Sequence, residues 1–248
     1  MKKILLLLLS TVLGCSSDDC NVNANSTSAI SYMKIVEQYK EAGSPPFSIK
    51  EYNFDSNGKV VKEIFTNNTY PIYSYTSTFE YDEQNRLIKE FKNGQLSLKV
   101  IWTGNVAELF SSTNTKYAAF TFANGKLLNY KWGYAQQAPI TTIKYNYDNN
   151  DNVISIEKDN EVYVEYLQYQ SDILNPLHLL KSIQTVRSSF NYNFKNAFNV
   201  ERLYGYNGSD FIFQTTNYEY FRTLDSNNRV ISATDMKTLI YKTTYEYN

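Results

Sequence analysis

Residues able to perform acid–base or metal chemistry are few in this chain. Its 248 residues include one His and two Cys, so the paired imidazoles of most catalytic metal sites are missing. His178 lies between Leu177 and Leu179, where a lone imidazole is more often structural than catalytic. No Gly-x-Ser-x-Gly, His-Glu-x-x-His or Cys-x-x-Cys motif and no phosphate-binding Gly-rich loop is present. We therefore expect no catalytic residue, no cofactor and no metal site.

Carboxylates are the remaining candidates for catalysis. Glu80 with Asp82, and Glu161 with Glu165, share one face of a predicted strand, and two acids about 5–10 Å apart are what a glycosidase needs. The same spacing fits ordinary solvent-facing alternation, which is the interpretation that we favour. The acidic segment 148–151 suggests a calcium site. It lacks the Gly and distal Glu spacing of an EF-hand, so a weak surface calcium site is the remaining alternative.

Aromatic residues are the stronger indication of function. Trp102, Tyr130, Trp132 and Tyr134 flank two-residue turns, and aromatic rings on a sheet can stack on sugars or peptides. For a chain with 23 Tyr, the alternative that these rings fill the core is favoured. An uncovered edge strand could also accept a partner strand. The net charge of −1 argues against a nucleic-acid partner.

The candidate residues above lie on predicted strands that a repeated polar turn connects. The segments 51–61, 78–88 and 144–154 match position by position, 222–231 is a degenerate copy, and 192–200 keeps the spacing with Lys195 in place of Asp. Each copy with Asp begins its turn with a side chain that can bond the backbone two residues on, followed by a residue suited to positive φ. The predicted turn residues are Asp55, Gly58, Asp82, Asn85, Asp148, Asp151, Asp225 and Asn228.

Shorter turns carry Asn-Gly, the strongest short-range hairpin signal. They are Asn93–Gly94, Asn124–Gly125 and Asn207–Gly208. The flanking segments alternate with period two and are rich in Tyr, Phe, Thr and Val, as in 241–247. We expect the tyrosine hydroxyls to reach water or one another. One short helical turn is expected after Pro176.

The amino terminus is typical of an export signal. Lys2 and Lys3 precede a short apolar run, and the segment 12–15 ends it with Gly14–Cys15. These four residues resemble a bacterial lipobox, which implies a signal peptide over 1–14 and lipidation of Cys15, hence a membrane partner through the lipid. An ordinary secretory signal cleaved before Asp18 is the alternative. Residues 15–31 read as a flexible tether.

The tether also suggests a location. Ser16 differs from the Asp that retains some lipoproteins in the inner membrane, and Asp18–Asp19 resembles the surface-export tags of some Gram-negative lipoproteins. The expected location is therefore the outer membrane, at the cell surface or on the periplasmic face. Cys20 would be a free thiol or a source of dimers.

The unit Tyr-x-Tyr/Phe-Asp-x-x-Gly/Asn-Lys/Arg-Leu/Val, clearest at 52–61, 79–88 and 145–154, resembles the YD repeat of the RHS type. The chain also resembles bacterial lipoproteins that join a lipobox to such repeats. In large YD-repeat proteins the hairpins spiral into a shell around a toxin, for which this chain is too short. The resemblance implies successive hairpins that add to one sheet.

We therefore predict a single all-β domain over 32–248, an antiparallel meander of hairpins forming a strongly twisted sheet or an open or partly closed barrel. The expected function is that of a membrane-anchored, non-catalytic envelope lipoprotein, a binding or scaffold module that acts through its aromatic-rich sheet on a glycan or protein partner. The alternative is a cell-envelope glycan hydrolase whose carboxylates the sequence does not identify.

Overall fold

The computed structural model describes residues 30–39, 43, 45–133, 140–183, 196–207, 210–235 and 241–248. The signal segment 1–14, Cys15, Cys20, most of the tether, Tyr134, Gly208 and Lys195 lie outside these ranges. Its strands are β1 (Tyr32–Tyr39), β2 (Ser48–Phe54), β3 (Val60–Asn67), β4 (Tyr75–Tyr81), β5 (Leu87–Lys92), β6 (Gln95–Thr103), β7 (Val106–Ser111), β8 (Lys116–Ala123), β9 (Lys126–Trp132), β10 (Thr141–Tyr147), β11 (Val153–Lys158), β12 (Glu161–Leu174), β13 (Asn196–Asn207), β14 (Asp210–Leu224), β15 (Val230–Asp235) and β16 (Tyr241–Tyr247). Two 3₁₀ segments, η1 (Pro71–Tyr73) and η2 (Pro176–Ile183), complete the described elements.

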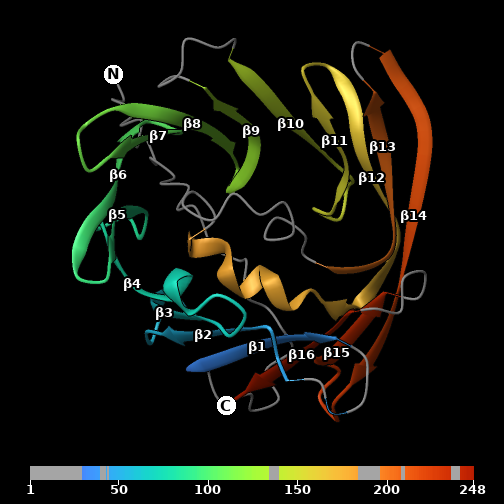
Figure 1. The fold of residues 1–248 in the computed structure, drawn as a ribbon. Coiled ribbons are helices and arrows are strands. Elements are labelled where there is room, and N and C mark those ends of the chain that lie inside the picture. The colour runs from blue at the N-terminus through green and yellow to red at the C-terminus, as the bar shows by residue number, and fades with distance from the viewer. Residues whose placement is uncertain are drawn as a thin grey trace, which may run out of the picture.

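Every strand pairs antiparallel with the strands before and after it, which confirms the predicted all-β meander. The sequence left closure of the sheet open. In the structure β1 pairs with β16 as well as with β2, with Met33 opposite Tyr247 and Ile35 opposite Tyr245, so the strand order closes into a barrel (Figure 1). The first and last strands are therefore no free edges, and they do not offer the strand-accepting edge that the sequence raised.

The Asp-containing turns connect β2–β3, β4–β5, β10–β11 and β14–β15, and in a meander these connections lie at one end of the barrel, here called the aspartate end. At the first turn, Asp55 Oδ1 accepts the N–H groups of Asn57 and Lys59, each at 2.9 Å, and Gly58 has φ of 73°. At the corresponding position φ is also positive in Asn85, Asp151 and Asn228. Ser31 N–H donates to Asn248 O at 3.3 Å, so both ends of the barrel chain meet here.

Two of the three predicted Asn-Gly turns, Asn93–Gly94 and Asn124–Gly125, use positive φ at both residues. Asn93 has φ of 51° and Gly94 of 79°, while Asn124 has 49° and Gly125 has 73°. Asn207 ends β13 opposite Asp210. Successive connections of a meander alternate between the two ends of the barrel. Asn93–Gly94, which connects β5 to β6, and η1, which connects β3 to β4, therefore lie at the opposite end, here called the η1 end.

The interior of the barrel holds η2, which Figure 1 shows inside the ring of strands. Leu180 and Ile183 of η2 are fully buried and pack with Met33, Tyr52 and Leu87. This segment confirms the predicted helical turn after Pro176. A second cluster covers the inner face of β6–β12 and includes Val100, Leu109, Phe120, Ile143, Tyr145, Ile156, Val164 and Tyr166. Since side chains alternate along a strand, the residues between these positions face outward. Within the described ranges, no helix is long and apolar enough to cross a bilayer.

Candidate functional site

Aromatic side chains at the aspartate end bond the backbone of the neighbouring hairpin. The donor–acceptor pairs are Tyr81 Oη to Val60 O at 2.6 Å, Trp102 Nε1 to Leu87 O at 2.9 Å, Tyr147 Oη to Leu127 O at 2.7 Å, Tyr247 Oη to Val230 O at 2.9 Å, and Tyr169 Oη to Val153 O. We call them the aromatic–carbonyl bonds. Each acceptor belongs to the first inward aliphatic residue after a turn, and all five of these turns carry a register shift typical of a β-bulge.

For Tyr81, Tyr147, Tyr169 and Tyr247, these bonds correct the expectation that the hydroxyls reach water or one another. A bulge leaves a backbone group outside the ladder, and a buried carbonyl needs a donor. Burial raises the pKa of Tyr81 to about 12 and raises that of Tyr147 as well, so both hydroxyls keep their protons at neutral pH. The aromatic residues themselves are evident in the sequence. The carbonyl that each one bonds lies on another hairpin, so local spacing could not reveal it.

The four aromatic residues predicted to bind a ligand are not gathered on one exposed surface. Trp102 packs on Phe122, with ring centroids 5.3 Å apart, in the interior cluster. Tyr130 stacks on Phe120 with ring centroids 4.5 Å apart, and burial raises the pKa of the Tyr130 hydroxyl. Trp132, opposite Ala118 and Thr141, is 40% exposed. Tyr134 lies outside the described residues. Trp102 and Tyr130 are thus partly buried and pack against the interior cluster.

Of the acidic residues considered for catalysis, Glu80 and Asp82 each bind a basic side chain. Glu80 forms an ion pair with Lys89 at 2.7 Å on the outer face, and Asp82 pairs with Arg86 at 2.8 Å inside its turn. Glu161 is exposed at the start of β12, and Glu165 lies opposite Ser155. For Glu80 and Asp82, these ion pairs favour the solvent-facing interpretation over catalysis.

The calcium and imidazole candidates also have structural places. Asp148 Oδ1 accepts the N–H groups of Asn150 and Asn152, each at 2.8 Å, and Asp151 forms an ion pair with Lys126. His178 lies within η2. Among the residues that the structure describes, no group of three or more His, Cys, Asp or Glu side chains is arranged to hold a metal ion.

Two buried carboxylates that the sequence analysis missed lie on the inner face of β3 and β5. Glu63 is 1% exposed and accepts the hydroxyls of Tyr52 at 3.3 Å and Tyr75 at 3.4 Å. Glu90 is 2% exposed and accepts the Ser77 hydroxyl at 2.7 Å. The available signal for their burial was their position opposite inward aromatic residues, Tyr52 for Glu63 and Phe79 for Glu90. Hydroxyl donors compensate for their burial, and side chains so little exposed do not meet a substrate in this conformation.

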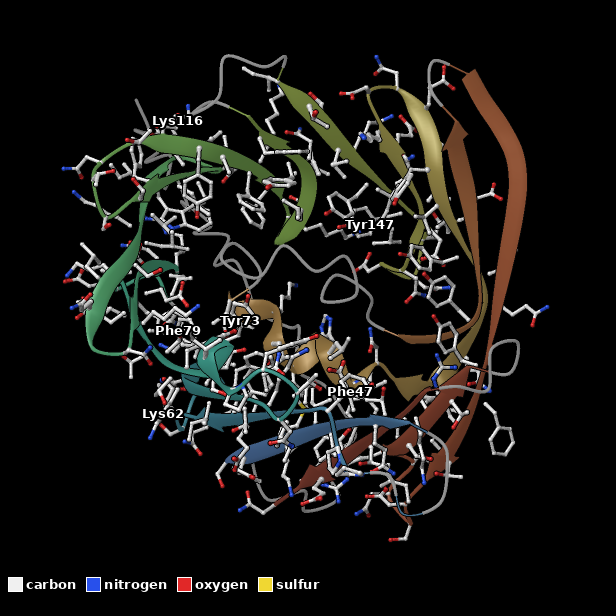
Figure 2. The ribbon with its side chains drawn as sticks, viewed as in Figure 1. Phe47, Lys62, Tyr73, Phe79, Lys116 and Tyr147 are labelled. Atoms are coloured by element: carbon white, nitrogen blue, oxygen red, sulfur yellow. The ribbon has the colours of Figure 1, made fainter. Side chains whose placement is uncertain are left out.

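The outer wall carries charged pairs that join neighbouring strands. They are Lys34–Glu246 at 3.2 Å, Lys89–Glu80 at 2.7 Å, Lys116–Glu108 at 2.5 Å and Lys144–Glu157 at 3.0 Å. Figure 2 shows Lys62 and Lys116 on the outside of the ring and Tyr147 on its inside. Each charged residue alternates with inward residues of the two clusters, so the polarity of the wall follows from strand periodicity.

The most exposed apolar group lies at the η1 end, in the loop of residues 67–74, here called the η1 loop. Ile72 is 88% exposed, Tyr70 60% and Tyr73 64%. The two tyrosine rings meet edge to face with centroids 6.1 Å apart. The largest exposed apolar patch of a monomeric protein is often functional, so this loop is a second candidate for binding. The sequence signal was a charge-free run from 64 to 79.

Comparison with known proteins gives a fold but no family. No family model and no curated protein matches the chain. Among solved structures, it is similar to a porin-like protein from Bacteroides uniformis, with a TM-score of 0.58 and 13% identity over 90% of this chain and 99% of that one. A porin-like protein from Bacteroides vulgatus aligns with a TM-score of 0.39 and 12% identity over 88% of this chain and 98% of that one. The first similarity shows a shared β fold.

Proposed function

We propose that this chain is a non-catalytic envelope lipoprotein, tethered through a lipid on Cys15, whose barrel stands in water beside the outer membrane and serves as a binding or scaffold module. The lipobox-like residues 12–15 support the anchor. The YD-type repeat is proposed as the sequence form of its hairpins. The similarity in fold to a porin-like protein supports a place in the envelope.

The observation that carries this proposal is the set of charged pairs on the outer wall. A barrel that spans a bilayer presents an apolar band outward and a polar lumen inward, and a Lys at the bilayer midplane costs about 2–4 kcal/mol. Here Lys34, Lys89, Lys116 and Lys144 face outward in pairs with glutamates. The inner face instead holds two apolar clusters and η2. This polarity suits a barrel surrounded by water.

Metabolic labelling with radioactive palmitate tests the anchor. Wild-type protein is expected to incorporate the label and to sediment with membranes after a carbonate wash. Cys15→Ala is expected to lose the label, whereas Cys20→Ala, the matched control five residues on, keeps it. A Cys15→Ala protein that stays in washed membranes with unchanged apparent mass would show that the lipid anchor is wrong.

A panel of envelope glycans and peptides tests the non-catalytic role. Saturable binding without a change in the ligand is the expected result, because Glu80, Asp82, Glu63 and Glu90 are all bound by neighbouring groups. Release of a smaller sugar product, abolished by substituting one of these acids, would instead establish the glycan hydrolase.

A further inference from the structure

The η1 loop combines features that suit contact with lipid. Its tip, Ile72, is an aliphatic side chain 88% exposed, and a tyrosine stands on each side of it, Tyr70 at 60% and Tyr73 at 64% exposed. Tyrosine is enriched where a bilayer meets water, because its ring is apolar and its hydroxyl is polar. No Lys, Arg, Asp or Glu occurs from 64 to 79, so no charge of this segment opposes entry.

The backbone of the η1 loop satisfies most of its donors internally. Tyr73 N–H donates to Tyr70 O at 3.0 Å, and Ser74 N–H donates to Pro71 O at 2.9 Å. Tyr70 N–H donates to Asn67 Oδ1 at 2.7 Å, and Pro71 has no N–H. Unsatisfied backbone groups are the main cost of moving a loop out of water into lipid. The part of that cost that comes from N–H donors is therefore largely avoided at this tip.

The loop is also fixed on the barrel before any ligand arrives. Asn67 N–H donates to Ser74 Oγ at 2.9 Å, which closes the base of the loop. Asn68 Nδ2 donates to Pro46 O at 2.8 Å and its N–H donates to Phe47 O at 3.0 Å, which join it to the neighbouring β1–β2 connection. A loop already held in this way loses little conformational freedom when it docks.

We propose that the η1 loop inserts Ile72, flanked by Tyr70 and Tyr73, into the surface of the membrane to which the protein is tethered. This inference rests on the proposed lipid anchor. The tether, residues 15–31, joins the barrel at the aspartate end and spans at most about 60 Å when extended. Strand β1 has 8 residues and rises about 26 Å. The tether is therefore long enough to run back along the wall and let the η1 end rest on the same bilayer.

The test uses the full lipidated protein, reconstituted in vesicles of phosphatidylethanolamine and phosphatidylglycerol with phosphatidylcholine brominated on its acyl chains. Ile72→Trp reports on the loop, and Ile154→Trp, at a site 42% exposed on the outer wall, is the matched control. Fluorescence is compared with wild-type protein, which has two Trp. We expect the Trp introduced at position 72 to be blue-shifted and quenched by bromine, and the one at position 154 to be neither.

A second substitution separates insertion from mere proximity. Adding Tyr73→Asp to Ile72→Trp places a charge on the loop and is expected to lower the bromine quenching at least about tenfold. Circular dichroism of each variant confirms that the barrel is folded.

Three results overturn the proposal. One is protein that floats with the vesicles while the introduced Trp at position 72 stays unquenched, which removes the insertion and leaves the anchor. Another is a blue shift in the fluorescence of the Trp introduced at position 72 when glycan or peptide is added but not when lipid is added. That result would assign the loop to a glycan or peptide partner. Protein that does not float at all rejects the lipid anchor together with this inference.

Discussion

Tyr147 and Tyr73 show how differently the two ends of the barrel use the same residue type. At the aspartate end, Tyr147 is partly buried and donates its hydroxyl to Leu127 O at 2.7 Å. At the η1 end, Tyr73 is 64% exposed and packs mainly on Tyr70. The bulges at the aspartate end leave carbonyls that need donors, and the tyrosines serve stability there. The η1 loop satisfies its own backbone, so its tyrosines stay available for binding.

The largest expected contrast between the ends is in aliphatic burial. Leu87→Ala at the aspartate end, where the side chain is 2% exposed, is expected to lower the free energy of unfolding by about 2–5 kcal/mol through lost burial and a cavity. Ile72→Ala at the η1 end is expected to change it by less than about 0.5 kcal/mol. Urea unfolding of the non-lipidated Cys15→Ala protein measures both. Equal losses at the two sites would mean that the η1 loop is packed in solution.

Removal of single hydroxyl groups is the next test of the contrast. Tyr147→Phe leaves the Leu127 carbonyl without its donor and is expected to cost about 1–3 kcal/mol. Tyr73→Phe is expected to stay within about 0.5 kcal/mol of wild type, because its ring is exposed. The same urea titration applies. A neutral Tyr147→Phe would remove the stabilising role of the aromatic–carbonyl bonds.

The turns at the two ends are expected to differ in their response to pH. Burial raises the pKa of Asp82, but the N–H and guanidinium of Arg86 and the N–H of Gln84 lower it more, and the net pKa is lowered. A pKa below the unfolded value near 3.9 means that this stabilisation is present at neutral pH and is lost as pH falls below about 4. Asp82→Asn is expected to cost about 1 kcal/mol at pH 7 and less at pH 2.5.

Asn93 provides the pH-independent control at the η1 end. Its Oδ1 accepts the Thr76 N–H at 2.9 Å, and an amide does not titrate in this range. Asn93→Ala is therefore expected to cost the same at pH 7 and pH 2.5. An Asp82→Asn loss that does not shrink in acid would show that charge is not what Asp82 contributes.

The smallest effect is expected on the wall between the ends. Glu80 and Lys89 pair at 2.7 Å with side chains 48% and 39% exposed, and exposed pairs contribute about 0.2–1 kcal/mol. A double-mutant cycle with Glu80→Gln and Lys89→Met is expected to give a coupling energy in this range that falls as salt rises. A coupling that salt leaves unchanged would contradict a water-exposed wall.

Local features of the fold followed from sequence, whereas features that join distant segments did not. The turn at Asp55 was predictable because its hydrogen bonds reach only to Asn57 and Lys59. Closure by β1 and β16 depends on pairs such as Met33 with Tyr247, far apart in the chain. The placement of η2 inside the ring is likewise set by distant contacts, such as Val60 N–H to Ser182 Oγ at 3.1 Å.

The candidate site shows the same limit. Trp102 met the sequence criterion for a stacking residue, yet its indole N–H donates to Leu87 O at 2.9 Å, a bond that requires the pairing of β5 with β6. Ile72 and Tyr73 look like ordinary strand-forming residues in sequence. Pro71 starts a 3₁₀ turn there, and that turn leaves both side chains exposed at the η1 end.

The contact between Ser31 and Asn248 has a consequence for biogenesis. Ser31 Oγ donates to Asn248 Oδ1 at 3.0 Å across 217 positions. Strand β1 therefore forms its hydrogen bonds with β16 only after β16 has been synthesised. Such nonlocal pairing folds slowly. Until β16 has been synthesised, the early hairpins expose an unpaired strand edge, and in that interval a chaperone or a protease can bind this edge.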